Sequence, residues 1–161
     1  MPCIHNYMAL IKEYFSLTEK YIAEYGENTI VLMQVGAFFE VYGLRHTSGE
    51  LRGSNISNFS RICDLNIADK KQCVGKEGVV MAGFSHYMID KYLKKLQETG
   101  YTIIVYTQDE QAKNTTRSLA GIYSPGTYFS PDVEHITNNI GCIWINMVEM
   151  TQKSVLRRIE N

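Results

Sequence analysis

A long helical repeat of apolar residues at the start of the chain runs directly into a short β-branched stretch. Apolar and aromatic residues recur every three or four positions over residues 7–25, which predicts one face of an amphipathic helix. Gly26 and Asn28 follow and predict its end. Residues 29–35 are β-branched and apolar and predict a buried strand. A helix followed at once by a buried strand indicates a sheet with helices packed on it.

Similar patterns continue along the chain. Short apolar runs predict strands over residues 38–42, 79–84, 101–107, 119–123 and 140–148. Helical spacing predicts helices over residues 57–65 and 85–99. Polar, glycine-containing stretches predict loops over residues 46–55, 66–78 and 108–117, the second of them mobile. The predicted fold class is α/β, with α+β as the alternative: a mixed β-sheet flanked by helices.

Composition and charge are those of an ordinary globular protein. The 161 residues are 45% hydrophobic and 20% charged, with a formal net charge of −1, so the chain as a whole shows no electrostatic footprint for nucleic acid. Residues 61–95 carry seven basic against four acidic side chains. A solvated helix face produces the same local excess, so this count supports a phosphate-binding surface only weakly.

Targeting signals and cysteine spacing bear on the compartment. The first residues lack the basic and apolar regions of a signal peptide, and the longest apolar run is too short to span a membrane. The four cysteines are scattered without a C-x-x-C pair, which is typical of reduced thiols in an intracellular protein. We therefore expect an intracellular protein, in a compartment that the sequence does not specify.

The stretch "VLMQVGAFFEVYG" places two phenylalanines and a glutamate directly after Gly36. Because side chains alternate along a strand, Phe38 and Glu40 share one face, whereas Phe39 lies on the other, the expected core face. Glycine at position 36 permits an unusual backbone angle just before them. Two interpretations are open: Phe38 packs under the first helix while Glu40 is solvated, or both project toward a ligand.

No complete catalytic motif is found in the chain. Gly75 and Lys76 lack the upstream glycine of a P-loop, the histidines are not at zinc spacing relative to the cysteines, and no G-x-S-x-G or paired-carboxylate cluster occurs. We therefore expect no enzymatic activity from this chain by itself, and no bound metal or other cofactor.

Gly36, Phe38 and Glu40 form the pattern G-x-F-x-E after an apolar strand, which resembles the mismatch-recognition motif of the MutS family of DNA mismatch-repair proteins. The resemblance extends over residues 14–43, which are similar to the opening helix, strand and motif of that family's N-terminal domain. Residues 79–108 resemble its M-A-G-[IF] strand, following helix and next strand, and "GIYSPGT" resembles its closing R-x-x-T-P-G-T turn. The version F-F-E-V-Y-G is similar to the branch from large DNA viruses and coral mitochondria.

The resemblance has two departures. Ala37 stands where the family often has aspartate before the motif phenylalanine. Ser85, His86 and Tyr87 stand where many members read P-Y-H, which puts in doubt the backbone contacts that the family makes at this helix start.

The resemblance implies a domain division and a set of DNA-binding residues. Residues 1–128 would form the mismatch-recognition domain, and residues 129–161 a connection and the first strand of the following connector domain. Phe38 would be a wedge that stacks on a mispaired base, with Glu40 at the edge of that base. The residues expected to bind DNA are Phe38, Glu40, Gly36, Arg61, Lys70, Lys71 and Lys76.

The resemblance also implies partners and cofactors of a longer protein. The partner would be mismatched double-stranded DNA, the full-length form a dimer, and no membrane would be involved. ATP and Mg would be cofactors of the full-length ATPase, not of this chain. Two alternatives remain: a nuclease-like enzyme, against which the missing catalytic motif argues, and a protein-interaction module in which Phe38 anchors a protein partner without a DNA role.

Overall fold

The computed structural model describes residues 3–109, 116–125 and 127. Helix α1 (Cys3–Tyr25) comes first and is followed by the hairpin of strands β1 (Thr29–Val35) and β2 (Phe38–Arg45). The other elements are β3 (Leu51–Arg52), α2 (Ile56–Cys63), β4 (Ala68–Val74), β5 (Glu77–Ser85), the 3-10 helix η1 (His86–Met88), α3 (Ile89–Glu98), β6 (Thr102–Gln108) and β7 (Arg117–Tyr123). The strand predicted over residues 140–148 and the domain boundary at residue 128 lie outside the described residues.

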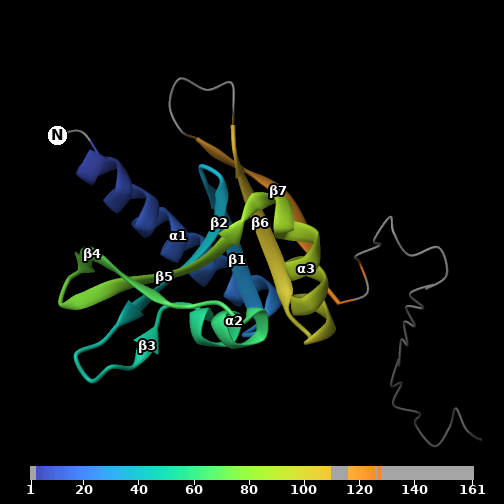
Figure 1. Ribbon diagram of the computed structural model, residues 1–161, viewed down its shortest axis with the longest axis horizontal. Coiled ribbons are helices and arrows are strands. Elements are labelled where there is room, and N and C mark those ends of the chain that lie inside the picture. Colours follow the sequence, from blue (N-terminus) through green and yellow to red (C-terminus); the bar gives the residue numbers. More distant parts are fainter. Residues whose placement is uncertain (1–2, 110–115, 126, 128–161) are drawn as a thin grey trace, which may run out of the picture.

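The described strands form one mixed sheet of seven strands (Figure 1). Their order is β4-β5-β2-β1-β6-β7, and the short β3 pairs with β2. β1 and β6 are parallel, whereas the other neighbouring pairs are antiparallel. The predicted α/β class with a mixed sheet flanked by helices is therefore confirmed.

Helices cover both faces of this sheet. On one face, the Tyr14 ring of α1 meets the Tyr42 ring of β2 edge-on, with 5.1 Å between centroids. On the other face, the Phe84 ring of β5 lies 6.2 Å from Phe59 of α2 and 4.3 Å from Tyr92 of α3. Because strands alternate, neighbouring residues of β2 enter two different apolar layers. The strand is therefore buried on both sides along most of its length.

The prediction of a mobile loop over residues 66–78 is wrong. This stretch contains β4 and the start of β5, which form an antiparallel hairpin around a turn at Gly75. β4 is an edge strand whose residues alternate between exposed and half-buried, and its polar sequence ADKKQCV hides the strand from a hydrophobicity pattern. The loop predicted over residues 46–55 likewise contains the two-residue strand β3.

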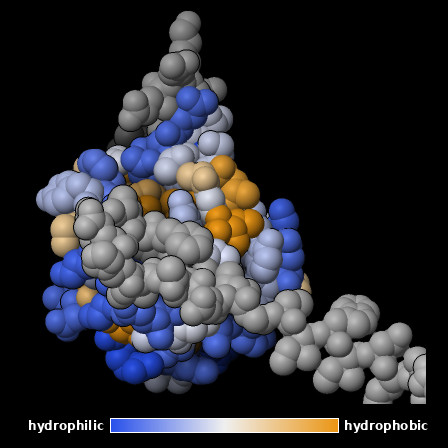
Figure 2. Space-filling view, turned by 90° about the vertical axis from the view of Figure 1, so that its right-hand side faces the viewer, coloured by the Kyte–Doolittle hydropathy of each residue, from blue (hydrophilic) through white to orange (hydrophobic). Residues whose placement is uncertain are grey.

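The opposite edge of the sheet carries exposed apolar residues. Leu119 and Ile122 of β7 are 45% and 38% exposed, and their partners on β6 are Tyr106 and Ile104. Figure 2 shows hydrophobic side chains gathered on the side of the molecule that carries β7. Exposed apolar groups of this kind often mark interaction surfaces.

Candidate nucleic-acid interface

The β1–β2 turn presents Phe38 to solvent. Gly36 has φ = +59°, in the left-handed region that favours glycine, and it reverses the chain with Ala37. Phe38 is the first residue of β2 and is 51% exposed, whereas Phe39 is 4% exposed. The predicted hairpin and the core position of Phe39 are confirmed, and the interpretation that Phe38 packs under the first helix is wrong.

Hydrogen bonds fix this turn from both sides. The backbone N–H of Gly36 donates to Oε1 of Gln108, at the end of β6, over 2.8 Å. The backbone N–H of His86 donates to the carbonyl oxygen of Ala37 over 2.9 Å, and Nδ1 of the same histidine lies 3.1 Å from that oxygen. Gln34 adds a bond from its side-chain amide to the Gly36 carbonyl, over 3.2 Å. The backbone that carries Phe38 is thus positioned by contacts within the protein itself.

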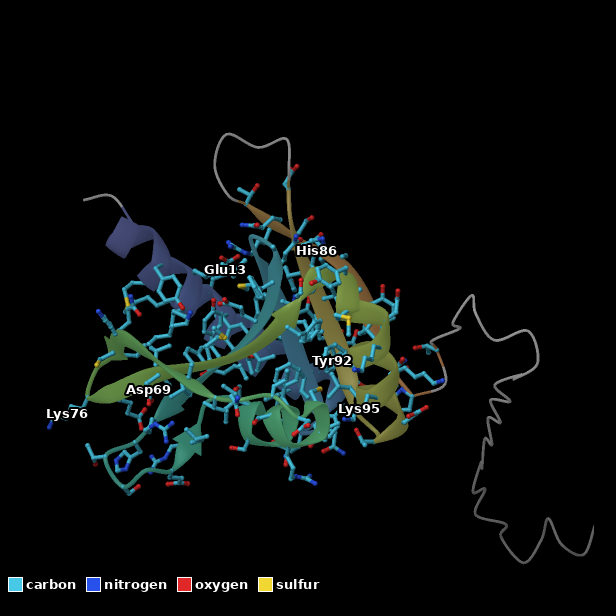
Figure 3. All side chains as sticks on the ribbon, in the orientation of Figure 1. Glu13, Asp69, Lys76, His86, Tyr92 and Lys95 are labelled. Atoms are coloured by element: carbon cyan, nitrogen blue, oxygen red, sulfur yellow. The ribbon has the colours of Figure 1, made fainter. Side chains whose placement is uncertain are left out.

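A second exposed aromatic lies at the same end of the sheet. Phe38 pairs with Ser85, the last residue of β5. Two residues further on, Tyr87 is 76% exposed. Figure 3 shows the neighbouring His86 at the end of β5 that lies beside the β1–β2 turn. This end of the molecule therefore offers two aromatic side chains to a partner.

Glu40 does not project outward with Phe38. The two residues share a face, as alternation predicts, but Glu40 is only 7% exposed. Its carboxylate accepts a hydrogen bond from the hydroxyl group of Tyr42, which is fully buried. Burial, and then the negative charge of Glu40, raise the pKa of Tyr42 far above its ordinary value. The expectation that Glu40 is exposed is wrong, because α1 covers this face of the sheet.

Gly83 makes room for the Glu40 side chain. The two residues are directly paired between β2 and β5. A Cβ atom at position 83 would lie 2.7 Å from the carbonyl oxygen of Phe39 and 3.3 Å from Cγ of Glu40. The first of these distances is shorter than atoms tolerate, and the oxygen belongs to the backbone, so it cannot move aside easily.

The mutation Gly83→Ala is therefore expected to lower the free energy of unfolding by about 1–3 kcal/mol, the usual cost of overpacking. Gly78→Ala is the matched control, because Gly78 lies in the same strand and a Cβ atom there would meet nothing within 4 Å. We expect that control to keep the stability of the wild type or to raise it by up to about 1 kcal/mol. Urea denaturation of both variants is the measurement, and equal stabilities would contradict the close approach at Gly83.

The basic residues predicted to bind phosphate do not surround Phe38. Lys76 lies at the tip of the β4–β5 hairpin (Figure 3). Ser85, the partner of Phe38, is nine residues further along the chain, a distance of about 30 Å in an extended strand. Lys71 is exposed on β4, whereas the ammonium group of Lys70 lies 5.8 Å from the ring centre of Tyr7. Arg61 is exposed on α2.

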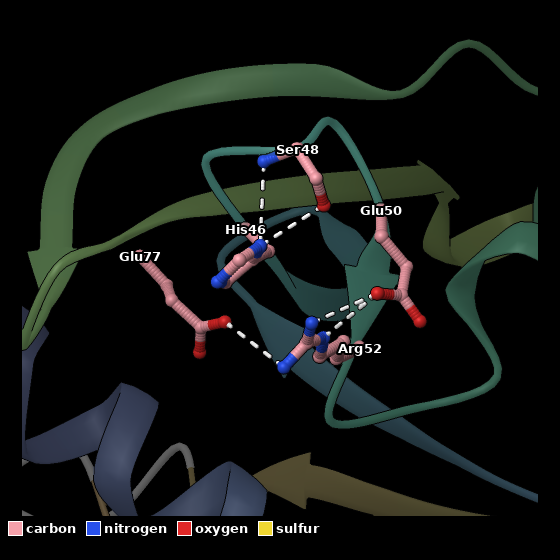
Figure 4. Close-up of polar contacts among 5 residues, drawn as sticks. All are labelled: His46, Ser48, Glu50, Arg52 and Glu77. Atoms are coloured by element: carbon pink, nitrogen blue, oxygen red, sulfur yellow. Dashed lines mark hydrogen bonds and ion pairs between the residues drawn. The ribbon is translucent and has the colours of Figure 1, made fainter.

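Two arginines near that hairpin are paired with acidic groups. Arg52 contacts Glu50 at 2.8 Å and Glu77 at 4.0 Å (Figure 4). Arg45 contacts Asp69 at 2.9 Å. These side chains are substantially exposed, so the ion pairs add little to stability, but they lower the local positive potential. The surface around the hairpin is consequently of mixed charge.

Several contacts of this site have no signal in the sequence. Gln108 reaches Gly36 only because β1 and β6 are parallel neighbours, and the two residues are 72 positions apart. His86 reaches Ala37 through the pairing of β2 with β5. The Tyr42–Glu40 bond is an exception, since alternation predicts that residues two apart on one strand face are neighbours.

The described residues also bear on metal sites, thiols and membrane spans. Within residues 3–109, 116–125 and 127, no three His, Cys, Asp or Glu side chains are grouped so that they could hold a metal ion. Cys63 and Cys73 are free thiols, the first buried and the second exposed. Among the described helices, none has both the length and the apolar character to cross a membrane.

Comparison with known proteins connects this geometry to a family. Residues 8–132 match the family model of MutS domain I. A mutS homolog from Acanthamoeba polyphaga mimivirus is 33% identical over 121 residues, which are 73% of this chain and 10% of that protein. The DNA mismatch repair protein MutS of Parabacteroides distasonis is 30% identical over 136 residues, 81% of this chain and 14% of the relative.

A mitochondrial DNA mismatch repair protein mutS homolog from Sarcophyton glaucum is 25% identical over 137 residues, 70% of this chain and 13% of the relative. The resemblance to viral and coral mitochondrial proteins is therefore confirmed, although bacterial proteins are similar too. The chain spans between a tenth and a seventh of the length of these relatives. Because the domain I model matches most of its residues, the chain belongs to the MutS family.

Proposed function

We propose that this chain recognises mismatched DNA as the N-terminal part of a MutS-like ATPase, and that Phe38 is the wedge that enters the duplex. The observation that carries the proposal is the half-exposed Phe38 at the tip of a hydrogen-bonded turn. Single exposed apolar residues are ordinary, but Phe38 is held on a fixed backbone at the same end of the sheet as the exposed Tyr87, which supports an aromatic contact surface. Family membership supports DNA as that partner.

An inserted aromatic side chain can distinguish a mismatched duplex from a paired one by how easily the duplex deforms. A mispaired base step is easier to unstack and kink than a paired one, so an inserted side chain samples the deformability of the duplex and not the identity of its bases. Stacking of a base on an aromatic ring contributes roughly 1–3 kcal/mol and offsets part of the unstacking cost. Because the turn is already fixed by Gln108 and His86, little conformational entropy is lost when Phe38 inserts.

Phosphate contacts are proposed for Arg61, Lys70, Lys71 and Lys76. Their distance from Phe38 requires either that the duplex run along the sheet toward the β4–β5 hairpin, or that these residues serve only solubility. With a net charge of −1, few phosphates are neutralised by the chain alone. Tight binding then depends on the remainder of a full-length dimer that also carries the ATP and Mg site.

The test is a titration of the full-length protein with a mismatched duplex and a paired duplex of equal length, each at several salt concentrations. We expect tighter binding of the mismatched duplex at every salt concentration, while both affinities fall as salt rises. The isolated chain should bind either duplex more weakly than about 1 μM at physiological salt. Equal affinities of the full-length protein for the two duplexes would exclude mismatch recognition and favour the protein-interaction alternative.

A further inference from the structure

Glu40 occupies an unexpected place for a group that is proposed to contact DNA. The residue is 7% exposed, and it shares the face of β2 on which Tyr42 packs against Tyr14 of α1. A buried carboxylate is costly unless a hydrogen-bond donor compensates for the lost water. Here the donor is the Tyr42 hydroxyl group, two residues further along the same strand face. The Glu40 carboxylate is therefore held inside the protein by its bond to Tyr42.

The donor is rigid and the acceptor is not. The ring of Tyr42 is fully buried and contacts two rings of α1 edge-on: Tyr7 with 6.1 Å and Tyr14 with 5.1 Å between centroids. Glutamate, by contrast, has three rotatable carbon–carbon bonds between its backbone and its carboxylate. Across the sheet lies Gly83, which has no side chain to confine it. The Glu40 carboxylate can thus move while Tyr42 stays in place.

We propose that Tyr42 is a latch, which holds the Glu40 carboxylate inside the DNA-free protein and releases it at a mismatched base. This inference rests on the proposed function. On paired DNA the carboxylate stays bonded to Tyr42, so it does not approach the phosphates and repel them. At a mismatch, an unpaired base N–H replaces Tyr42 as the donor. Tyr42 is accordingly a positioning residue for mismatch recognition and not itself a DNA contact.

The latch has a measurable consequence for affinity. If a ligand binds only the molecules whose carboxylate is released, its apparent Kd is the intrinsic Kd divided by the fraction of such molecules. Hydrogen bonds to charged groups are strong enough for their removal to change such a population about tenfold. Removing the Tyr42 hydroxyl group should therefore tighten binding to the mismatched duplex, an effect opposite to that of an ordinary damaging mutation.

The first experiment is the titration of full-length Tyr42→Phe with mismatched and paired duplexes. We expect about tenfold tighter binding of the mismatched duplex and no tightening for the paired one. Tyr14→Phe is the matched control, because it loses an equally buried hydroxyl group that donates to the Val31 carbonyl over 3.3 Å. This control should leave the ratio of the two affinities unchanged. In a Glu40→Met background, Tyr42→Phe should also leave that ratio unchanged.

The second experiment needs no DNA. Thermal unfolding of the wild type, Tyr42→Phe, Glu40→Met and the double variant forms a double-mutant cycle. We expect the shifts in melting temperature to be non-additive, since either change alone breaks the same bond. Additive shifts would overturn the latch itself, as would a Tyr42→Phe variant whose mismatch preference is unchanged or lower. A wild-type protein without mismatch preference would overturn the proposed function and the release step, even if the cycle were non-additive.

Discussion

Replacing Phe39 with alanine is expected to lower the free energy of unfolding by about 3–5 kcal/mol, the usual cost of truncating a buried aromatic residue. The side chain is 4% exposed and its ring lies 5.9 Å from that of Phe84. Phe84 in turn contacts Phe59 and Tyr92, so the cavity would open in the middle of an aromatic cluster that joins β2 and β5 to α2 and α3. Such a cluster cannot collapse around the missing ring without moving two helices.

Phe38→Ala is the matched control for this prediction. It removes the same side chain from the adjacent position of the same strand, but the side chain is half-exposed and its loss should change stability by less than about 0.5 kcal/mol. Thermal and urea denaturation of both variants are the measurements, with each kcal/mol corresponding to about 2–4 °C in melting temperature. A larger loss for Phe38→Ala than for Phe39→Ala would contradict the assignment of faces.

Most elements of the fold were predictable because their patterns are strong. The 23-residue helix α1 has a sustained apolar repeat, and β1, β2 and β6 are runs of β-branched and aromatic residues. β4 was missed because an edge strand needs little apolar surface and is protected from aggregation by polar and charged residues such as Lys71. β4 is a strand because its backbone pairs with that of β5, and the sequence of β4 alone does not indicate this pairing.

The sequence predicted only those features of the candidate site that depend on the alternation of side chains within β2. Alternation correctly placed Phe38 and Phe39 on opposite faces. Alternation does not indicate whether another element covers the face that carries Phe38 and Glu40. In the structure α1 packs on that face, and Glu40 is buried. The apolar stripe of α1 contained part of this information, since a stripe with Tyr14 on it must pack on some face of the sheet. The supports from Gln108 and His86 depend on tertiary pairing and carry no local signal.

Stability and recognition are consequently divided between adjacent residues. Phe39 belongs to the layer formed with α2 and α3, whereas Phe38 is half-exposed on the opposite face of β2. A substitution at position 38 can change DNA binding without unfolding the protein. This separation makes the proposed wedge testable, because a loss of binding by Phe38→Ala cannot be attributed to a loss of structure once its unfolding curve matches the wild type.

Phe38→Ala in the full-length protein is expected to remove most of the preference for mismatched over paired duplex. The stacking interaction contributes about 1–3 kcal/mol, so the ratio of the two affinities should fall by about 5–150-fold. Binding to paired DNA should change by less than about twofold, since phosphate contacts supply most non-specific affinity and Phe38 carries no charge. Titration of both duplexes at one fixed salt concentration measures both quantities.

Tyr87→Ala is the control that separates a wedge from a general aromatic contact. Tyr87 is 76% exposed at the same end of the sheet, but it follows β5 and does not lie on the β1–β2 turn. If only Phe38 enters the duplex, Tyr87→Ala lowers both affinities equally or leaves them unchanged, and the ratio is preserved. If Phe38→Ala also weakens both duplexes equally, the aromatic residues at this end merely contact DNA, and Phe38 is not a mismatch wedge.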